Sequence, residues 1–243
     1  MKIVAIVQAR MGSTRLPGKV IMDLEGEPAL VRCINRLKRA KCLDEIVIAT
    51  TNKKRDKVIV DLCIKKRWKY FRGNEDDVLD RYYQAAKAFQ GDIIVRVTSD
   101  CPLIEPTIVD AVVTTMIEHF HAHDYTANNL TRTFPIGLDT EAFTIEALER
   151  AWKEDKNPAW REHVTPYIRF HPEIFSYLEF QNDKDLSYMR WTLDTKEDLE
   201  FLRRIYKRFN GKDDFSWKDV LKILENEPEL CRINAHVKQK VII

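Results

Sequence analysis

The chain has 243 residues, 44% of them hydrophobic, and its 40 Lys and Arg nearly cancel its 38 Asp and Glu, leaving a formal charge of +2. A chain of this length can bury about three quarters of its unfolded surface, which favours one domain over residues 1–243. The small net charge gives no global field to attract nucleic acid or an anionic membrane, so we expect neither as a partner. No apolar run reaches membrane-spanning length, which predicts a cytoplasmic protein.

Short runs rich in Val and Ile predict strands buried on both faces, at 3–7, 45–50 and 92–98. Helical patterns lie between and after them, several with Pro or acidic residues in the first turn. The expected helices are 28–38, 54–66, 76–89, 106–119, 145–153, 196–209 and 217–225, and further strand candidates are 175–180 and 189–193. This alternation predicts a doubly wound, mostly parallel α/β sheet with helices on both faces and ligands outside the carboxyl ends of its strands.

The stretch QARMGSTRLPGKV, residues 8–20, follows the first strand and has the composition of a phosphate-binding loop. Its cations and glycines are Arg10, Arg15, Lys19, Gly12 and Gly18. Arg and Lys donate to phosphate oxygens, and glycines let backbone amides approach an anion closely. A Walker A loop is excluded, because five residues separate the glycines and Val20 replaces the hydroxyl that holds magnesium. A solvated basic turn is the alternative interpretation, and any metal must be held elsewhere.

Two aspartates are candidates for that metal site. Asp100 follows the strand at 92–98, and Asp194 ends the strand candidate at 189–193. Mg²⁺ typically takes one or two protein carboxylates, with waters and phosphates completing its shell. Alternatively, Asp100 forms a turn and Asp194 caps the following helix. Cys101 has no activating base nearby in sequence, so we interpret it as a packing residue, and the five cysteines without a CxxC pair indicate reduced thiols.

Six segments together resemble the cytidylyltransferase family that activates sugar acids as CMP derivatives, which includes CMP-Kdo synthetase and acylneuraminate cytidylyltransferase. The likeness is closest to the spore-coat polysaccharide SpsF-type branch. The segments are QARMGSTRLPGKV at 8–20, NEDDVLDRYYQA at 74–85, SDCPLIEP at 99–106, PIGLDTEAFT at 135–144, REHVTPYI at 161–168 and LDTKEDLE at 193–200. Thr98 and Ser99 stand where CMP-Kdo synthetases have Gln and Gly, so the resemblance does not supply the acceptor.

The resemblance implies a GT-A-like nucleotidyltransferase fold, with acceptor binding and dimerisation in a less regular region around 124–190. It implies CTP and a small anionic sugar as substrates, a homodimer, and Mg²⁺ held by Asp100 and Asp194. Arg15, Lys19 and Asp100 would be catalytic. The residues expected at the nucleotide are Gln8, Ala9, Arg10, Gly12, Ser13, Arg15 and Lys19 in the loop, Asp80 and Arg81 near the base, and Ser99.

Four further residues are candidates for binding the acceptor. Arg161 and His163 could hold an acid group, because Arg pairs bidentately with carboxylate or phosphate and His changes charge near neutral pH. Asp139 and Glu141 alternate along an extended segment and so point to one face. Asp139 and Glu141 could bind sugar hydroxyls, or they could merely cover an edge of the sheet. Arg161 and His163 could instead be ordinary surface charges. The triplet His119, His121 and His123 is typical of a solvated helix end rather than of zinc.

Three other functions remain as alternatives to transfer of CMP from CTP to a sugar acid. One is transfer to a phosphonate or a sugar phosphate. Another is a nucleotide-binding subunit without turnover, which the two carboxylates disfavour. A glycosyltransferase of the same sheet family is disfavoured because the first half of the chain has no DxD motif near its fourth strand.

Overall fold

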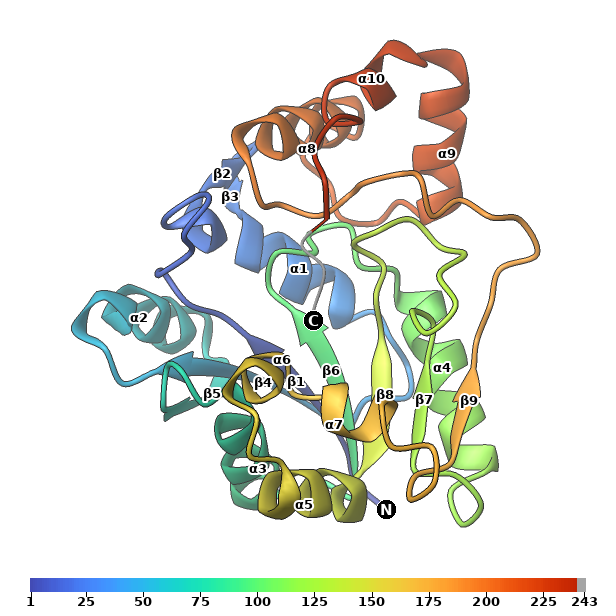
Figure 1. Ribbon diagram of the computed structural model, residues 1–243. Coiled ribbons are helices and arrows are strands. Elements are labelled where there is room, and N and C mark those ends of the chain that lie inside the picture. The colour runs from blue at the N-terminus through green and yellow to red at the C-terminus, as the bar shows by residue number, and fades with distance from the viewer. Residues whose placement is uncertain (240–243) are drawn as a thin grey trace.

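The computed structural model describes residues 1–239 and is built around a seven-stranded sheet (Figure 1). The strands lie in the order β5-β4-β1-β6-β8-β7-β9. Their bounds are β1 (Ile3–Gln8), β4 (Glu45–Thr51), β5 (Lys69–Gly73), β6 (Ile93–Thr98), β7 (Tyr125–Ala127), β8 (Glu141–Thr144) and β9 (Tyr177–Glu179). The first four of that order are parallel, whereas β8 is antiparallel to both β6 and β7. The mixed, mostly parallel sheet expected from the sequence is confirmed.

Helices cover both faces of the sheet, because alternate side chains of β1 enter two separate cores. Val7 packs in the core that α1, α4 and α8 share, whereas Ile6 packs in the core of α3 and α5. Figure 1 shows α8, α9 and α10 gathered at one end of the molecule. The helices are α1 (Ala29–Leu37), α2 (Lys57–Lys66), α3 (Val78–Ala88), α4 (Pro106–Glu118), α5 (Ile145–Glu154), α6 (Pro158–His163), α7 (Pro166–Arg169), α8 (Lys196–Arg208), α9 (Trp217–Asn226) and α10 (Glu229–Arg232). Short elements complete the described chain: η1 (Lys19–Ile21), η2 (Lys54–Asp56) and the hairpin of β2 (Asp23–Leu24) and β3 (Glu27–Pro28).

The strand register brings three distant segments to one edge of the sheet. Gln8 at the end of β1 is paired with Thr98 at the end of β6. The backbone amide of Leu193 donates to the carbonyl of Asp100 at 2.8 Å, so the segment before α8 crosses the end of β6. The loop after β1, the turn after β6 and the segment at 193–194 therefore meet where parallel sheets place their ligands.

One predicted strand is wrong, and neither the β2-β3 hairpin nor three short strands of the seven-stranded sheet were expected. Residues 189–193 form no ladder and pair only through an isolated bridge between Ile136 and Arg190. The three unexpected strands are β5, β7 and β8. Strand β5 lies at the edge of the sheet with exposed or half-buried residues, and β7 has only three residues, so neither carries a clear apolar pattern.

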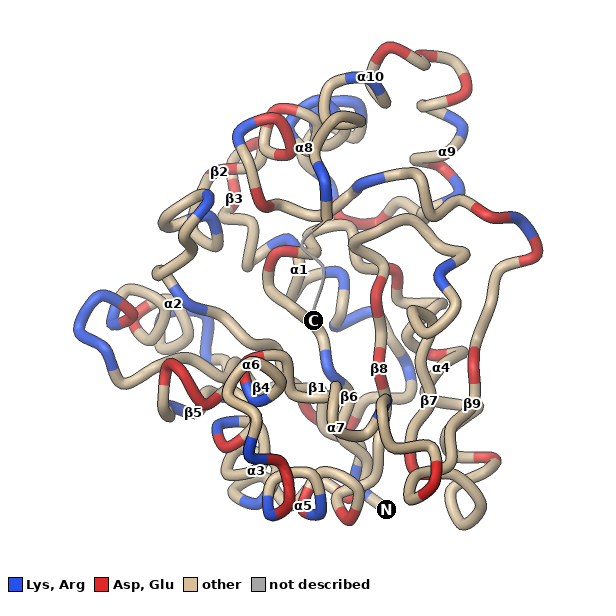
Figure 2. The backbone as a smooth tube through the Cα atoms, in the orientation of Figure 1, with Lys and Arg blue, Asp and Glu red and all other residues tan. Residues whose placement is uncertain are grey.

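Region 124–190 contributes β7, β8 and β9 to the sheet, together with the helices α5, α6 and α7. Figure 2 shows both charge signs interspersed along most of the chain, in keeping with the small net charge. Within residues 1–239, no helix is long and apolar enough to cross a bilayer.

Candidate active site

The loop after β1 is shaped by Gly18 and by backbone bonds. Gly18 has φ +73°, a left-handed conformation that glycine adopts without steric cost, and η1 begins directly after it. Its amide donates to the carbonyl of Met11 at 2.9 Å, which closes the loop, and the amide of Met11 donates to Asp56 at 2.6 Å. Gly18 therefore serves the turn, and its amide is engaged within the loop.

Gly12, which the sequence places at the nucleotide, lies beside the side chains of Arg55 and Glu75. A Cβ atom at this position would lie 2.6 Å from the Nη2 atom of Arg55 and 2.8 Å from the Oε1 atom of Glu75. These two side chains form an ion pair against the loop. The pair thus approaches the backbone at Gly12 through the mobile ends of two side chains, and Gly12 does not line the cavity described below.

Lys19 lies between the two aspartates that the sequence singled out. Its Nζ atom is 2.5 Å from Oδ2 of Asp100 and 2.8 Å from Oδ1 of Asp194. Burial alone would lower the pKa of Lys19, but the two carboxylates outweigh it and hold the pKa above its ordinary value. Burial likewise would raise the pKa of Asp100, and the charge and hydrogen bond of Lys19 bring it below its ordinary value. Lys19 and Asp100 are therefore both charged at neutral pH.

Asp194 is fixed from two directions. The guanidinium groups of Arg15 and Arg190 lie 2.9 and 2.8 Å from its Oδ2 atom. Its backbone amide donates to Asp198, which also completes the capping box of α8 with Thr195. Thr195 and Asp198 therefore cap α8, so Asp194 is not the helix cap that the sequence offered as an alternative. The Asp194 carboxylate instead faces Arg15 and Lys19 of the loop.

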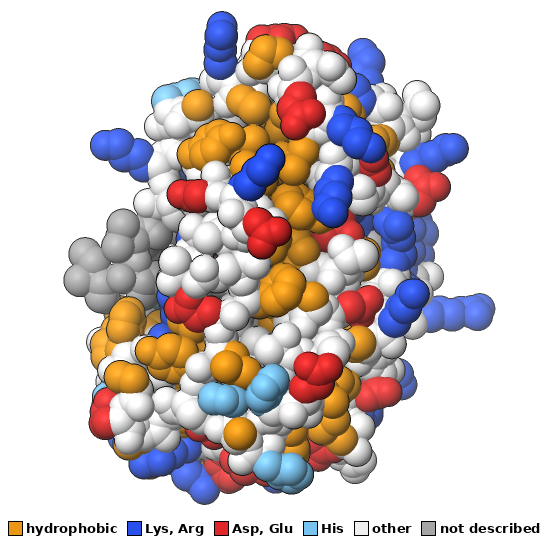
Figure 3. Space-filling model, turned by 90° about the vertical axis from the view of Figure 1, so that its right-hand side faces the viewer, with side chains coloured by type: hydrophobic (Ala, Val, Ile, Leu, Met, Phe, Trp, Pro, Cys, Tyr) orange, Lys and Arg blue, Asp and Glu red, His pale blue; other side chains and the backbone are white. Residues whose placement is uncertain are grey.

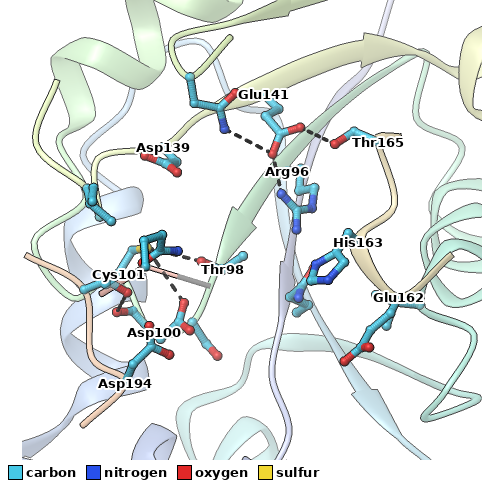
Figure 4. A pocket seen from close by; sticks show the side chains of 18 of the residues that line it. Arg96, Thr98, Asp100, Cys101, Asp139, Glu141, Glu162, His163, Thr165 and Asp194 are labelled. Atoms are coloured by element: carbon cyan, nitrogen blue, oxygen red, sulfur yellow. Dashed lines mark hydrogen bonds and ion pairs between the residues drawn. The ribbon is translucent and has the colours of Figure 1, made fainter. Parts of the chain in front are cut away.

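These groups line a cavity of about 660 Å³ that runs from the phosphate-loop side toward β8 and α7 (Figure 4). Its walls include most residues that the sequence assigned to the site: Gln8, Ala9, Arg10, Ser13, Arg15, Lys19, Arg81, Ser99, Asp100, Asp139, Glu141, His163 and Asp194. Gly12, Asp80 and Arg161 lie outside it. Most of the residues that the sequence assigned to one site therefore lie together around this cavity, and the function of each stays a prediction.

Asp80 and Arg161 line a separate hollow between α3, α5 and α6. Asp80 accepts a hydrogen bond from the indole of Trp152 at 2.9 Å. Arg161 donates to Asp77 from two nitrogens, at 3.0 and 2.8 Å, and to the carbonyls of Trp152 and Asp155. The expected placement of Arg161 at the acceptor is not what the structure shows, because its guanidinium is occupied in tying α6 to α3 and α5.

A turn at Val164 separates Arg161 from the residues that do reach the cavity. Val164 has φ +72° and ψ −56°, and the amide of Thr165 donates to the carbonyl of His163 at 2.9 Å, which together define a γ-turn. A β-branched residue in this conformation is strained, by about 1–3 kcal/mol, and such strain clusters at functional sites. The turn redirects the chain between α6 and α7, so that His163 and Thr165 line the cavity.

Glu141 is an internal counter-ion rather than an open acceptor of hydrogen bonds. It is 2% exposed and accepts from Arg96, from the hydroxyl of Tyr125 at 2.7 Å and from that of Thr165 at 2.6 Å. Burial would raise its pKa, but Arg96 and the other donors outweigh it and lower the pKa to about 2. Because its lone pairs are taken, Glu141 positions Arg96 and the wall of the cavity. Asp139 is similarly held, by Arg132 at 2.5 and 2.8 Å.

Three arginines that line the cavity were not predicted from the sequence, namely Arg96, Arg132 and Arg169. A signal existed for Arg96, since it interrupts an apolar strand, and a charge there requires a partner. No local pattern marks Arg132 or Arg169. Their position depends on the loop before β8 and on the turn at Val164.

Cys101 and the histidines after α4 are the remaining candidates that the sequence raised. Cys101 lines the cavity, and burial raises the pKa of its thiol well above the ordinary value, so it is a poor nucleophile. The rings of His119 and His123 contact each other edge to face just after α4. Figure 3 shows histidines grouped near the lower end of the face that it draws. No group of three or more metal-ligating side chains is found within the described part of the chain.

A cationic loop after the first strand thus faces two carboxylates at the carboxyl edge of a mixed sheet, inside one cavity. A family model described as cytidylyltransferase matches residues 4–240. The chain is 32% identical over 234 residues to the spore coat polysaccharide biosynthesis protein SpsF of Bacillus subtilis, covering 93% of this chain and 95% of that protein. Over 114 residues it is 34% identical to the 3-deoxy-manno-octulosonate cytidylyltransferase of Chlorobium phaeobacteroides, covering 46% of this chain and 44% of that one.

A solved cytidylyltransferase from Leptospira borgpetersenii superimposes with a TM-score of 0.92 at 35% identity, over 99% of both chains. The protein therefore belongs to the cytidylyltransferase family, as its motifs indicate. It is a CTP-dependent nucleotidyltransferase.

Proposed function

We propose that this enzyme transfers CMP from CTP to a small acidic sugar, releases pyrophosphate, and serves the biosynthesis of a surface polysaccharide. The relatives named for spore coat polysaccharide and for 3-deoxy-manno-octulosonate support the acceptor class. The observation that carries the proposal is the meeting of Arg15 and Lys19 with Asp100 and Asp194 in one cavity.

Transfer of a nucleotidyl group needs in-line attack on the α-phosphorus and neutralisation of the leaving pyrophosphate. Positioning and electrostatic stabilisation supply most of the rate enhancement, and no covalent nucleophile is needed. Arg15 and Lys19 would donate to the β- and γ-phosphates, and Arg10 extends the same cationic side of the cavity. The deeper part, toward β8 and α7, would hold the sugar.

The donor set fits a divalent cation. Oxygens of Asp100 and Asp194 already converge on one cation, the ammonium of Lys19, at 2.5 and 2.8 Å. Hard Mg²⁺ prefers such carboxylate oxygens together with phosphates and water. Asp100 and Asp194 would hold the metal, which when bound would neutralise phosphate charge. Lys19 would then turn from the carboxylates to the phosphates, keeping its charge compensated.

The test is release of pyrophosphate from each of the four nucleoside triphosphates, with acidic sugars, phosphonates, sugar phosphates and neutral sugars as acceptors. We expect turnover with CTP and an acidic sugar, and its loss after chelation of divalent metal. Asp100→Asn and Asp194→Asn should each abolish turnover while the fold is kept, since an amide is a poorer ligand for Mg²⁺. Near-wild-type release of pyrophosphate by either variant at saturating magnesium would exclude a metal site made of the two carboxylates. Tighter binding of ATP or GTP than of CTP would exclude CTP as the preferred nucleotide.

We also propose a cytoplasmic homodimer associating through region 124–190. Phe170, directly after α7, is 53% exposed, which suits a surface covered by a second copy. Light scattering on the purified protein tests the dimer, since a monomer at micromolar concentration would exclude it.

A further inference from the structure

The Asp194 carboxylate is oriented by side chains rather than by the sheet. The segment before it, residues 189–193, joins the sheet through one isolated bridge and no ladder. Arg190 lies 2.8 Å from its Oδ2 atom and is 5% exposed. Arg15 and Lys19 also pair with Asp194, but on the proposed function both turn to the phosphates. The direction of the carboxylate during the reaction therefore depends on what fixes Arg190.

Arg190 is fixed by one buried carboxylate and by the C-terminal segment, residues 233–239, which follows α10. Its Nε and Nη2 atoms donate to the two oxygens of Asp198, at 2.9 and 3.0 Å. Asn234 donates from Nδ2 to the carbonyl of Arg190 and to Oδ1 of Asp198, both at 2.9 Å. Oε1 of Gln239 accepts from Nη1 of Arg190 at 2.5 Å. Because Nε, Nη1 and Nη2 are all bonded, the planar guanidinium is held in one direction.

The C-terminal segment reaches the cavity from the far end of the molecule. Figure 1 shows the chain after α10 returning past α8 toward the sheet. Asn234 is 2% exposed and Asp198 is fully buried, so their bonds lie where a low dielectric strengthens them. Gln239 is exposed and lines the cavity itself. One end of this hydrogen-bond network is thus in the C-terminal segment, and the other end is on the Asp194 carboxylate.

We propose that the C-terminal segment is part of the active site, in which Asn234 and Gln239 are positioning residues that orient Asp194 through Arg190. With Arg190 on Oδ2, the oxygen left for a cation is Oδ1, which lies 2.8 Å from Nζ of Lys19. The inference rests on the proposed function, in which Asp194 holds the metal. Both positioning residues are uncharged, so replacing them changes the direction of the carboxylate and leaves the charge of the site as it is.

The test measures by calorimetry how much Mg²⁺ tightens the binding of CTP, as the ratio of the Kd without the metal to the Kd with it. Asn234→Leu keeps the volume of a buried side chain without its two bonds, and Gln239→Met keeps the length of an exposed one without its single bond. Partners of a metal ligand typically contribute about 10- to 100-fold to metal affinity. We expect the ratio to fall about 10-fold in Asn234→Leu and about threefold in Gln239→Met. The Kd of CTP without metal should stay within about twofold, because the phosphate loop is untouched.

Asn226→Leu is the matched control, since it makes the same replacement at an exposed residue at the end of α9, and its ratio should equal that of the wild type. Thermal unfolding checks the fold, and Gln239→Met decides the question if Asn234→Leu does not fold.

A wild-type ratio in the folded variants, or an equal loss of CTP affinity without metal, would overturn the role of the C-terminal segment. Asp194→Asn tells the two proposals apart. If it keeps the wild-type ratio, the proposed metal site is wrong and this inference falls with it. If it loses the ratio while Asn234→Leu and Gln239→Met keep it, the inference alone is wrong.

Discussion

The Glu141→Gln substitution should destabilise the enzyme at neutral pH and lose most of that effect in acid. The buried carboxylate holds Arg96 and accepts from two hydroxyls, and it keeps its charge because its pKa is lowered from 4.5 to about 2. Glutamine preserves the shape but leaves the Arg96 guanidinium without its counter-charge. Burial would lower the pKa of Arg96, and in the wild type the charge of Glu141 outweighs burial and holds that pKa above its ordinary value. The variant removes this counter-charge, whereas the guanidinium itself stays protonated because Arg does not lose its proton in proteins.

The magnitude follows from the proton linkage. One pH unit of pKa difference between unfolded and folded states corresponds to about 1.4 kcal/mol, so the Glu141 charge contributes about 3 kcal/mol to the free energy of unfolding. Removing one partner of a buried ion pair costs about 3–5 kcal/mol, which agrees in scale. Since the folded pKa is the lower one, this contribution is complete above the unfolded pKa of about 4.5 and is lost as pH falls toward 2.

The assay is urea unfolding of the wild type and the variant, at pH 7 and at steps down to pH 3. We expect the variant to be less stable by about 3 kcal/mol at pH 7 and the difference to shrink as the pH falls below 4.5. Glu173→Gln, on an exposed side chain, is the control and should match the wild type throughout. A difference below about 1 kcal/mol at pH 7, or one that does not change with pH, would refute the assignment of Glu141 as the counter-ion.

Three further substitutions separate the roles of other residues. Lys19→Ala should lower kcat/KM about 100- to 10,000-fold in the pyrophosphate assay, the scale of one positioned donor, and an unchanged value would remove Lys19 from the reaction. Arg161→Ala should reduce the free energy of unfolding by about 1–3 kcal/mol without changing the acceptor KM, because its bonds tie helices together, whereas a raised KM at intact stability would restore it to the acceptor site. Cys101→Ala should retain turnover, since the buried thiol is protonated, and loss of activity in a folded variant would contradict its packing role.

The sequence predicted the central strands and the carboxyl edge well, because these depend on local patterns. The bounds of β1, β4 and β6 agree within one residue, since a strand buried on both faces is a continuous apolar run. Asp100 could be placed at that edge because it directly follows such a strand. The meeting of Lys19 with Asp100 then follows from topology, because loops at one edge of a parallel sheet converge. Asp194 follows no strand and is brought there by the bond from the amide of Leu193 to the carbonyl of Asp100.

The positions of residues 189–193 and of the α6–α7 region could not be predicted in the same way, because bonds between residues far apart in the sequence determine them. Residues 189–193 have the composition of a strand, but Arg190 is drawn to Asp194 and Asp198, so the segment stays outside the sheet. Arg161 and Arg169 are eight positions apart on consecutive short helices, and neither has a periodicity that tells which one faces the cavity. The γ-turn at Val164 decides it, held by the bond from Thr165 to Glu141.

The internal ion pairs of the cavity explain why the net charge of +2 gives no hint of an anion-binding site. Arg10, Arg15 and Lys19 are each paired with a carboxylate, namely Glu162, Asp194 and the Asp100–Asp194 pair. On the proposed function, the metal and triphosphate exchange these pairs for new ones instead of creating charge in a dry cavity. Such an exchange avoids the several kcal/mol that an unpaired buried ion would cost before the ligand arrives.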